Sequence, residues 1–254
     1  MQPAVSARLL ELTRNPAVTV QQVSGLVELD PALTARVIRL ANAPYRGLRS
    51  PVTTARRAVV LLGISTVRAL AASFATRPSQ EDNDVPADFW ARSVLTASAA
   101  AGLAQRVGLP SQEAFTAGLL HDVGQALFHQ RDRAFYERLA GRPTLAVLAE
   151  ERDVFGVDHA EAGAAALADW RFPPIIVRAI QGHHATPGEQ HDSLARLVGL
   201  AHWLAQSAAD LAPTSALHST GVDALGLAGR ELRTLGQLAC GRLSGFASLL
   251  EARP

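Results

Sequence analysis

The chain has 254 residues, of which 48% are hydrophobic and 19% are charged, and its formal net charge is +1. This composition excludes an intrinsically disordered protein, and the single cysteine, Cys240, excludes an internal disulfide. No apolar run approaches the roughly 18 residues that a membrane span needs, and the N-terminal residues show no signal-peptide pattern. We therefore expect a cytoplasmic protein that does not contact a membrane.

Helical patterns follow one another along the chain, and no alternating strand pattern of useful length interrupts them. Residues 1–76 predict a first bundle of five short helices. Asp30 is an expected N-cap because Pro31 follows it as a first helical residue, and Gly63 is an expected C-cap. The polar, proline-bounded residues 77–86 are the predicted linker.

A second, larger helical bundle is predicted over residues 87–205, followed by a C-terminal helical extension over 206–254. One helix of this bundle begins near Pro110 and is expected to carry His121 and Asp122 as neighbours. The sequence therefore predicts an all-α fold in which the larger bundle packs against the smaller N-terminal one.

Positive charge is concentrated in one window of the sequence. No Asp or Glu occurs from Pro31 to Gln80, whereas eight arginines do. They are Arg36, Arg39, Arg46, Arg49, Arg56, Arg57, Arg68 and Arg77. An acidic protein or nucleotide could bind such a surface, although a solvated face whose arginine stems cover apolar groups is the favoured interpretation. Aromatic residues are not interleaved as single-strand binding requires, so we do not expect nucleic-acid binding.

A group of histidines and one aspartate lies in mainly apolar helical stretches. Its members are His121, Asp122, His159, His183 and His184. A lone histidine on an apolar face is usually a core residue, but several on successive helices can converge on a divalent metal such as Fe, Mn or Zn. A bound metal would activate water for phosphoester hydrolysis. Gly118 and Gly124 flank the His-Asp pair, and close helix packing is the expected reason for glycine there.

The order of four segments resembles the HDOD domain, a bacterial, all-helical relative of the HD-domain metal-dependent phosphohydrolases. The segments are "ELDPALTARVIRLANAPYRGLRSPVTTARRAVVLLGISTVRAL", "FWARSV", "AFTAGLLHDVGQALF" and "EERDVFGVDHAEAGAAALADWRFPPIIVRAIQGHH". The resemblance covers about residues 3–205 and implies an HD-like bundle over 87–205. It also implies a role in signal transduction.

The resemblance implies a metal-ligand pattern that this sequence matches only in part. The matching positions are His121, Asp122, His159, His183 and His184. Arg92 stands where the first ligating histidine is expected, and His202 stands where a late aspartate is expected. Because a guanidinium cannot ligate a cation, we expect no bound cofactor. If Fe, Mn or Zn is bound after all, the expected ligands are His121, Asp122, His159 and His183.

Arg92 leaves two interpretations open. In the first, Arg92 pairs with Asp122, and the side chain replaces the ion. In the second, Arg92 lies on the surface, and Asp122 accepts hydrogen bonds from backbone or histidine groups. His202 leaves room for a weakened metal site, because imidazole can ligate in place of carboxylate.

The expected function is therefore a non-catalytic regulatory protein that binds a signalling protein or an acidic or nucleotide ligand, and it could form a homo-oligomer. One candidate binding groove is formed by Arg92, His121, Asp122, His159, His183, His184 and His202. The other candidate is an arginine-rich partner surface, formed by Arg36, Arg39, Arg46, Arg49, Arg56 and Arg57. The alternative function is a metal-dependent phosphohydrolase or phosphodiesterase with a partly degenerate HD site.

Overall fold

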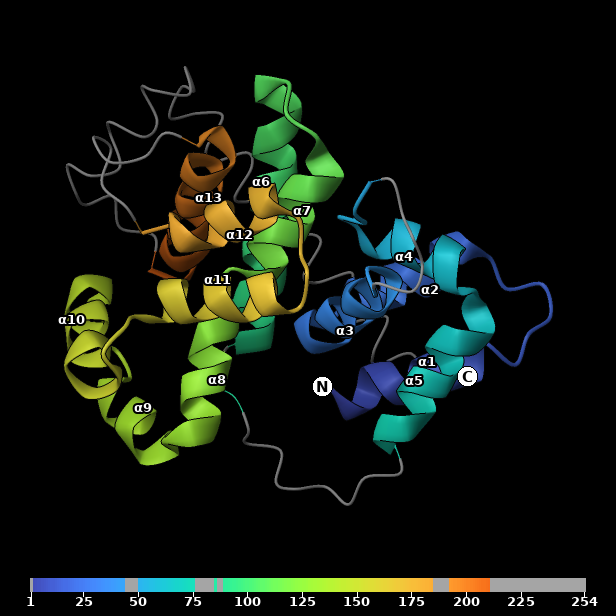
Figure 1. Cartoon of the computed structure of the whole chain (residues 1–254), viewed down its shortest axis with the longest axis horizontal. Coiled ribbons are helices and arrows are strands. Elements are labelled where there is room, and N and C mark those ends of the chain that lie inside the picture. Colours follow the sequence, from blue (N-terminus) through green and yellow to red (C-terminus); the bar gives the residue numbers. More distant parts are fainter. Residues whose placement is uncertain (1, 44–49, 76–84, 86–88, 185–191, 211–254) are drawn as a thin grey trace.

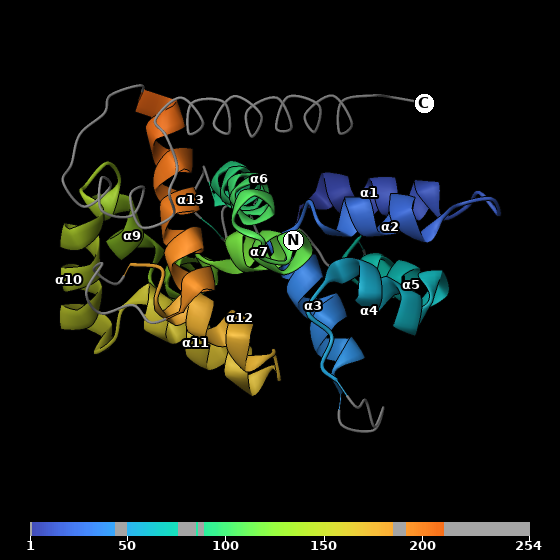
Figure 2. The ribbon, with the colours of Figure 1, turned by 90° about the horizontal axis from the view of Figure 1, so that it is seen from above.

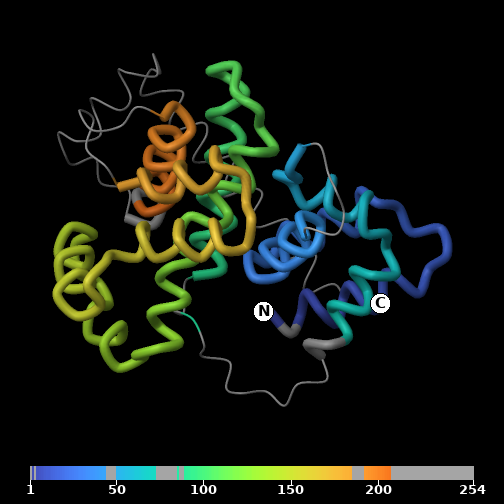
Figure 3. Tube along the Cα trace, in the orientation of Figure 1, coloured from blue at the N-terminus to red at the C-terminus, as the bar shows by residue number. Residues whose placement is uncertain are grey.

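A computed structural model describes residues 2–43, 50–75, 85, 89–184 and 192–210 of the chain. These residues form helices α1 to α13 and no strand, so the all-α prediction is confirmed for them (Figure 1). The tube in Figure 3 follows the chain from a first group of helices, blue to cyan, into a second group, green to orange. None of these helices combines the length and the hydrophobicity that crossing a bilayer requires.

In the first bundle, two helix ends lie at the capping residues that the sequence predicts. Its helices are α1 (Pro3–Leu12), α2 (Val20–Val27), α3 (Pro31–Ala41), α4 (Ala55–Leu62) and α5 (Ile64–Ala75). The side chain of Asp30 accepts a hydrogen bond from the backbone N–H of Leu33 at 3.0 Å and so caps α3. Gly63 ends α4 with a φ of 80°, which residues with a Cβ rarely adopt. Both capping predictions are confirmed.

The second bundle contains the remaining helices. They are α6 (Phe89–Val107), α7 (Ser111–Leu120), α8 (Val123–Arg131), α9 (Arg133–Leu139), α10 (Thr144–Phe155), α11 (His159–Asp169), α12 (Pro174–Gln181) and α13 (Ser193–Asp210). Helices α6, α7 and α13 pack against one another, and α11 contacts both α8 and α12. Asp158 caps α11 through the backbone N–H of Glu161, so His159 stands in the first turn.

One continuous hydrophobic core joins the two bundles, from Val5 in α1 to Leu204 in α13. Helix α3 lies beside α7 at their boundary in both views (Figures 1 and 2). The guanidinium of Arg39 in α3 also lies over the ring of Trp170, 5.8 Å from its centroid. The smaller bundle therefore packs against the larger one, as predicted. The proposed boundaries at residues 76, 86 and 205 stay predictions.

Two local predictions were wrong. His121 and Asp122 do not lie inside one helix, because α7 ends at Leu120 and α8 begins at Val123. Asp122, with φ −96° and ψ 16°, leaves the α-helical conformation and gives the chain a new direction. His183 and His184 likewise lie beyond α12, whose last residue is Gln181. The functional candidates are thus placed at helix ends, where backbone direction can change.

Candidate functional site

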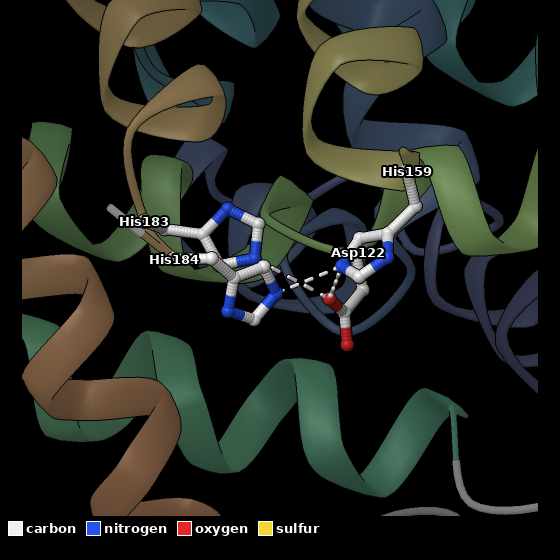
Figure 4. Close-up of side chains that lie close together, drawn as sticks. All are labelled: Asp122, His159, His183 and His184. Atoms are coloured by element: carbon white, nitrogen blue, oxygen red, sulfur yellow. Dashed lines mark hydrogen bonds and ion pairs between the residues drawn. The ribbon is translucent and has the colours of Figure 1, made fainter. Parts of the chain in front are cut away.

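Asp122 is the centre of the histidine cluster, and its side chain is 1% exposed. Nε2 of His121 lies 3.1 Å from its Oδ2 atom, whereas Nε2 of His159 and Nε2 of His183 lie 3.5 and 3.7 Å from its Oδ1 atom. His184 completes the group in Figure 4, where the rings from the start of α11 and the end of α12 converge on the carboxylate. The residues singled out in the sequence therefore meet at one buried place.

Arg92 reaches this carboxylate from α6. Its Nε atom lies 3.4 Å from Oδ2 of Asp122, and its Nη2 atom donates a hydrogen bond to Oε1 of Gln125 at 3.0 Å. The structure has the pairing of Arg92 with Asp122 that the first interpretation predicts. A permanent positive charge thus lies beside the carboxylate at the position where the resemblance implies a ligating histidine.

The outer nitrogens of two rings are held by backbone carbonyls. Nδ1 of His121 contacts the carbonyl oxygen of Gly118 at 2.7 Å, and Nδ1 of His183 contacts that of Ile180 at 2.6 Å. A carbonyl oxygen only accepts, so in each ring Nδ1 carries the proton. Each ring therefore turns its Nε2 atom toward Asp122. Hydrogen bonds to the other ring nitrogen orient metal-ligating histidines in the same way.

Glu151 performs the same role for His159. This fully buried carboxylate accepts from Nδ1 of His159 at 2.7 Å and from its backbone N–H at 2.8 Å, and it also accepts from the hydroxyl of Tyr136. The sequence analysis missed Glu151. The sequence signal that could have found it is its position eight residues before His159. In α10 this glutamate is buried together with Leu148.

The cluster divides into two sides around Asp122. On what we name the arginine side, Arg92 and His121 face Oδ2, and Nδ1 of His202 lies 2.7 Å from Nε2 of His121. On the histidine side, His159, His183 and His184 surround Oδ1. Nε2 of His159 and Nε2 of His184 lie only 2.9 Å apart there. His202 therefore joins the cluster through His121 on the arginine side.

Burial and charge act in opposite directions on these groups. Burial would raise the pKa of Asp122, but its interactions with His121, and those with His183 and His202, hold that pKa well below its usual range. Burial would lower the pKa of His159, yet the hydrogen bond to Glu151 and the nearby carboxylates raise it. Burial and repulsion between imidazoles lower the pKa of His183, His184 and His202. These last three rings are therefore neutral, as metal ligands must be.

The donor set fits a divalent metal ion. Both carboxylate oxygens of Asp122 and Nε2 of His183 are buried, and among the described residues none of them makes a hydrogen bond of regular geometry, although Oδ2 lies near Arg92 and His121. Buried polar atoms normally have a partner, so these atoms indicate a group that the protein is built to receive. Asp122, His159, His183 and His184 would hold such an ion, since one ligand atom of each lies within 4.8 Å of all the others.

A cavity of about 530 Å³ reaches the cluster from outside. Its polar lining includes Arg92, Gln125, His129, Tyr136, His159 and His202. Arg92 is 19% exposed, whereas His159 is fully buried, so the guanidinium is the more accessible of these two lining residues. A small ligand in this cavity could contact Arg92 directly.

The described arginines of the first bundle lie on α3, α4 and α5. Arg36, Arg39, Arg56, Arg57 and Arg68 are exposed, and Arg56 and Arg57 line a second cavity of about 600 Å³ with Glu113 of α7. Arg39 lies over Trp170 at the junction of the bundles. Three other arginines lie outside the described residues, namely Arg46, Arg49 and Arg77. Helix α4 thus carries two exposed arginines next to each other in the sequence, Arg56 and Arg57.

The family model described as the HDOD domain matches residues 1–186 of the chain. Among solved structures, the MmoQ response regulator from Methylococcus capsulatus is 32% identical, with 91% of this chain and 94% of that chain covered and a TM-score of 0.73. A candidate phosphohydrolase from Shewanella amazonensis is 28% identical, with 94% and 91% covered and a TM-score of 0.51.

More distant structures share only the fold. A virulence factor from Campylobacter jejuni is 17% identical, with 80% of this chain and 74% of that chain covered and a TM-score of 0.62. No curated protein matches the chain. The matches at higher identity thus include both a signalling protein and a protein regarded as a hydrolase. The choice between these two functions therefore depends on the residues around Asp122.

Proposed function

The chain belongs to the HDOD domain family, and from this premise we propose that it is a non-catalytic bacterial signal-transduction protein that acts by binding a protein or a small ligand. The observation that carries the proposal is the ion pair between Arg92 and Asp122, with Nε 3.4 Å from Oδ2. The guanidinium supplies the positive charge that a catalytic ion would supply in an HD-type site.

The burial of the other groups supports the same conclusion. A metal ion, where bound, would lower the pKa of a coordinated water and make it a nucleophile. Hydrolysis also needs an open coordination position and access for a phosphoester. His159 is fully excluded from solvent and His183 is 3% exposed, while the charged Arg92 both lines the cavity and pairs with Asp122. The residues around Asp122 are therefore arranged to bind a protein or a small ligand. They are also arranged to keep water out of the cluster.

Binding has two candidate surfaces. The cavity beside Arg92 suits a small acidic or nucleotide ligand, because the guanidinium borders it. The exposed Arg56 and Arg57 of α4 suit an acidic face of a signalling protein or of a second copy of the chain. The response-regulator name of the 32% identical relative supports a role in signalling.

A phosphodiesterase assay tests the absence of catalysis. The protein is incubated with bis(p-nitrophenyl) phosphate and with added Mn²⁺, Fe²⁺ or Zn²⁺, beside the Asp122→Asn variant. We expect equal background rates for both proteins with every metal. Turnover by the wild type that disappears in Asp122→Asn would contradict the proposal.

The alternative is a metal-dependent phosphohydrolase or phosphodiesterase. The orientation of His121 and His183 favours it, because backbone carbonyls hold Nδ1 of both rings and turn Nε2 toward Asp122, as in metal-ligating histidines. The same assay separates the alternatives. Activity restored or increased by Arg92→His, above that of the wild type, would show that the guanidinium is what suppresses hydrolysis.

A further inference from the structure

We propose that the chain associates with further copies of itself head to tail, with an exposed face of α4 in one copy against an exposed face of α10 in the next. The inference rests on the proposed function, because it names the partner of the α4 surface. Each face combines exposed apolar side chains with charge. The α4 face consists of Arg56, Arg57, Val60 and Leu61, and the α10 face consists of Asp153, Val154 and Val157.

Exposed apolar side chains mark both faces. The large apolar side chains that are exposed among the described residues are Val60, Leu61, Leu145, Val154, Val157 and Ile175. Four of them belong to the two faces, and Val60 and Val154 are the most exposed member of each face, at 63% and 53%. Neighbouring exposed apolar groups beside charged residues are typical of surfaces through which proteins associate.

Helical spacing places the members of the α4 face together. Val60 follows Arg56 by four residues, and Leu61 follows Arg57 by four, so the two charges and the two apolar groups lie on one side of α4. The remaining residues of this helix are buried. Helix α4 therefore has one side in the core and one side that is apolar, basic and exposed.

The charges of the two faces are complementary. On α10, Glu150 pairs with Arg142 and Arg152 pairs with Asp158. Asp153 is exposed directly before Val154, and it has no ion-pair partner in the part of the chain that the structure describes. The same holds for Arg57 on α4. An apolar contact between the faces would thus place a free cation opposite a free anion, which favours this pairing over others.

Charge also decides the symmetry of the association. A two-fold contact between two α4 faces would bring Arg56 and Arg57 of both copies together, and like charges repel. A two-fold contact between two α10 faces would oppose one Asp153 to another. The α4 face of one copy against the α10 face of the next pairs opposite charges instead.

The two faces of one copy cannot contact each other. Helices α4 and α10 lie far apart along the long axis of the molecule in both views (Figures 1 and 2). Each copy that binds through one face therefore leaves its other face open, and the association grows into an open chain or a closed ring. With two apolar side chains on each face the contact is small, as in transient signalling complexes, so association should be weak and should rise with protein concentration.

Sedimentation equilibrium of the full chain tests the inference. Protein is examined up to about 0.5 mM, which populates complexes with a Kd as weak as about 0.5 mM. We expect the average mass of the wild type to rise with concentration. Val60→Asp blocks the α4 face and Val154→Asp blocks the α10 face, so each variant should stay monomeric. Leu145→Asp is the matched control, because this side chain is 65% exposed on α10 but lies outside the α10 face. It should associate as the wild type does.

A mixture of the two blocked variants distinguishes head-to-tail association from other modes. Val60→Asp keeps an intact α10 face, and Val154→Asp keeps an intact α4 face. Mixed in equal amounts, they should form a 1:1 dimer that grows no further. A wild type that stays monomeric at the highest concentration, association that persists in either variant alone, or a mixture that stays monomeric would overturn the inference.

The charge pair provides a second test that does not depend on the valine variants. Circular dichroism checks that every variant folds, and if either valine variant does not, the charge variants decide. Arg57→Asp and Asp153→Arg should each weaken association roughly fivefold, as the loss of an exposed ion pair does. The double variant, in which the charges are exchanged, should regain the affinity of the wild type. Unchanged affinity in the single variants, or no recovery in the double variant, would contradict the pairing.

The outcome is independent of the hydrolysis assay. Phosphodiester turnover would contradict the proposed non-catalytic function and leave the association of α4 with α10 standing. A monomeric wild type would contradict the association and leave the non-catalytic function standing, with the cavity beside Arg92 as its binding surface.

Discussion

The backbone carbonyl oxygen of His159 lies 1.9 Å from the position that a Cβ atom on Gly124 would occupy. The carbonyl oxygen of His183 stands in a similar relation to Gly199, at 2.5 Å. Two histidines of the cluster are thus positioned by backbone that packs directly on a glycine. Any side chain at these glycines would push the start of α11 or the end of α12 away from Asp122.

Gly124→Ala is therefore expected to destabilise the protein by roughly 3 kcal/mol, the upper range for overpacking a well-packed interior. The added methyl group meets backbone atoms of His159 and Gly163, which cannot rotate away. Urea denaturation followed by circular dichroism measures the loss. Gly25→Ala in α2 is the control, because nothing lies within 4 Å of its new Cβ. It should gain about 0.5–1 kcal/mol from helix propensity, and equal effects of the two changes would contradict this account.

Glu151→Ala is expected to cost roughly 3 kcal/mol, because the hydroxyl of Tyr136 and two N–H groups of His159 lose a buried acceptor. Its neighbour Glu150 offers a matched control on the same helix. Glu150 pairs with Arg142, and both side chains are more than two-fifths exposed, so Glu150→Ala should cost less than about 0.5 kcal/mol. Similar losses for the two variants, measured by thermal denaturation, would show that Glu151 contributes no more than a surface carboxylate.

Much of the fold could be predicted because its signals are local. Asp30 before Pro31 marks a helix start and Gly63 marks a helix end through contacts within four residues, and the structure has both. Gly118 was also predicted to serve close packing, and its Cβ would lie 2.9 Å from Cα of Ala97 in α6. Helix caps depend on residues of one short segment, and close packing at a glycine depends on the absence of a side chain. Both can therefore be recognised in the sequence.

The structure of the site depends on tertiary contacts and was only partly predictable. The pairing of Arg92 with Asp122 joins residues 30 positions apart, and the sequence left it as one of two interpretations. Glu151 was missed because a glutamate in a helix is usually solvent-exposed, and only the approach of His159 and Tyr136 explains its burial. The break at Asp122 was missed because the apolar pattern continues through it.

Glu28, at the end of α2, gives a prediction of pH dependence remote from the cluster. Burial raises the pKa of this carboxyl from 4.5 to about 7, and the charge of Arg56 opposes the rise only in part. The folded state therefore keeps a proton that the unfolded state has lost, so stability falls as the pH rises from about 4.5 to about 7. The loss is at most about 3 kcal/mol.

Glu28→Gln removes this titration, since its amide stays neutral. We expect the wild type to lose more thermal stability than Glu28→Gln between pH 4.5 and pH 7.5, with melting temperatures measured in one series of buffers. Parallel pH profiles for the two proteins would show that Glu28 has an ordinary pKa in the folded state.

The ion pair between Arg92 and Asp122 is open to a double-mutant cycle in chelator-treated buffer. Arg92→Met alone leaves the buried carboxylate with less compensation and should cost about 2–3 kcal/mol. Combined with Asp122→Asn, the same change should cost less, because the neutral amide no longer needs the guanidinium. The expected coupling is about 1–3 kcal/mol, as residues in one charge network give.

The exposed pair of Arg8 and Glu11 in α1 is the control for this cycle. Its atoms lie closer, at 2.7 Å, but the side chains are 32% and 42% exposed. Solvent screening should limit its coupling to about 0.5 kcal/mol. A larger coupling for Arg92 and Asp122 at the longer distance would show that burial, and not contact distance, determines the strength of the pair. Additive costs at Arg92 and Asp122 would instead mean that the guanidinium does not compensate the carboxylate, and the central argument for a non-catalytic centre would fail.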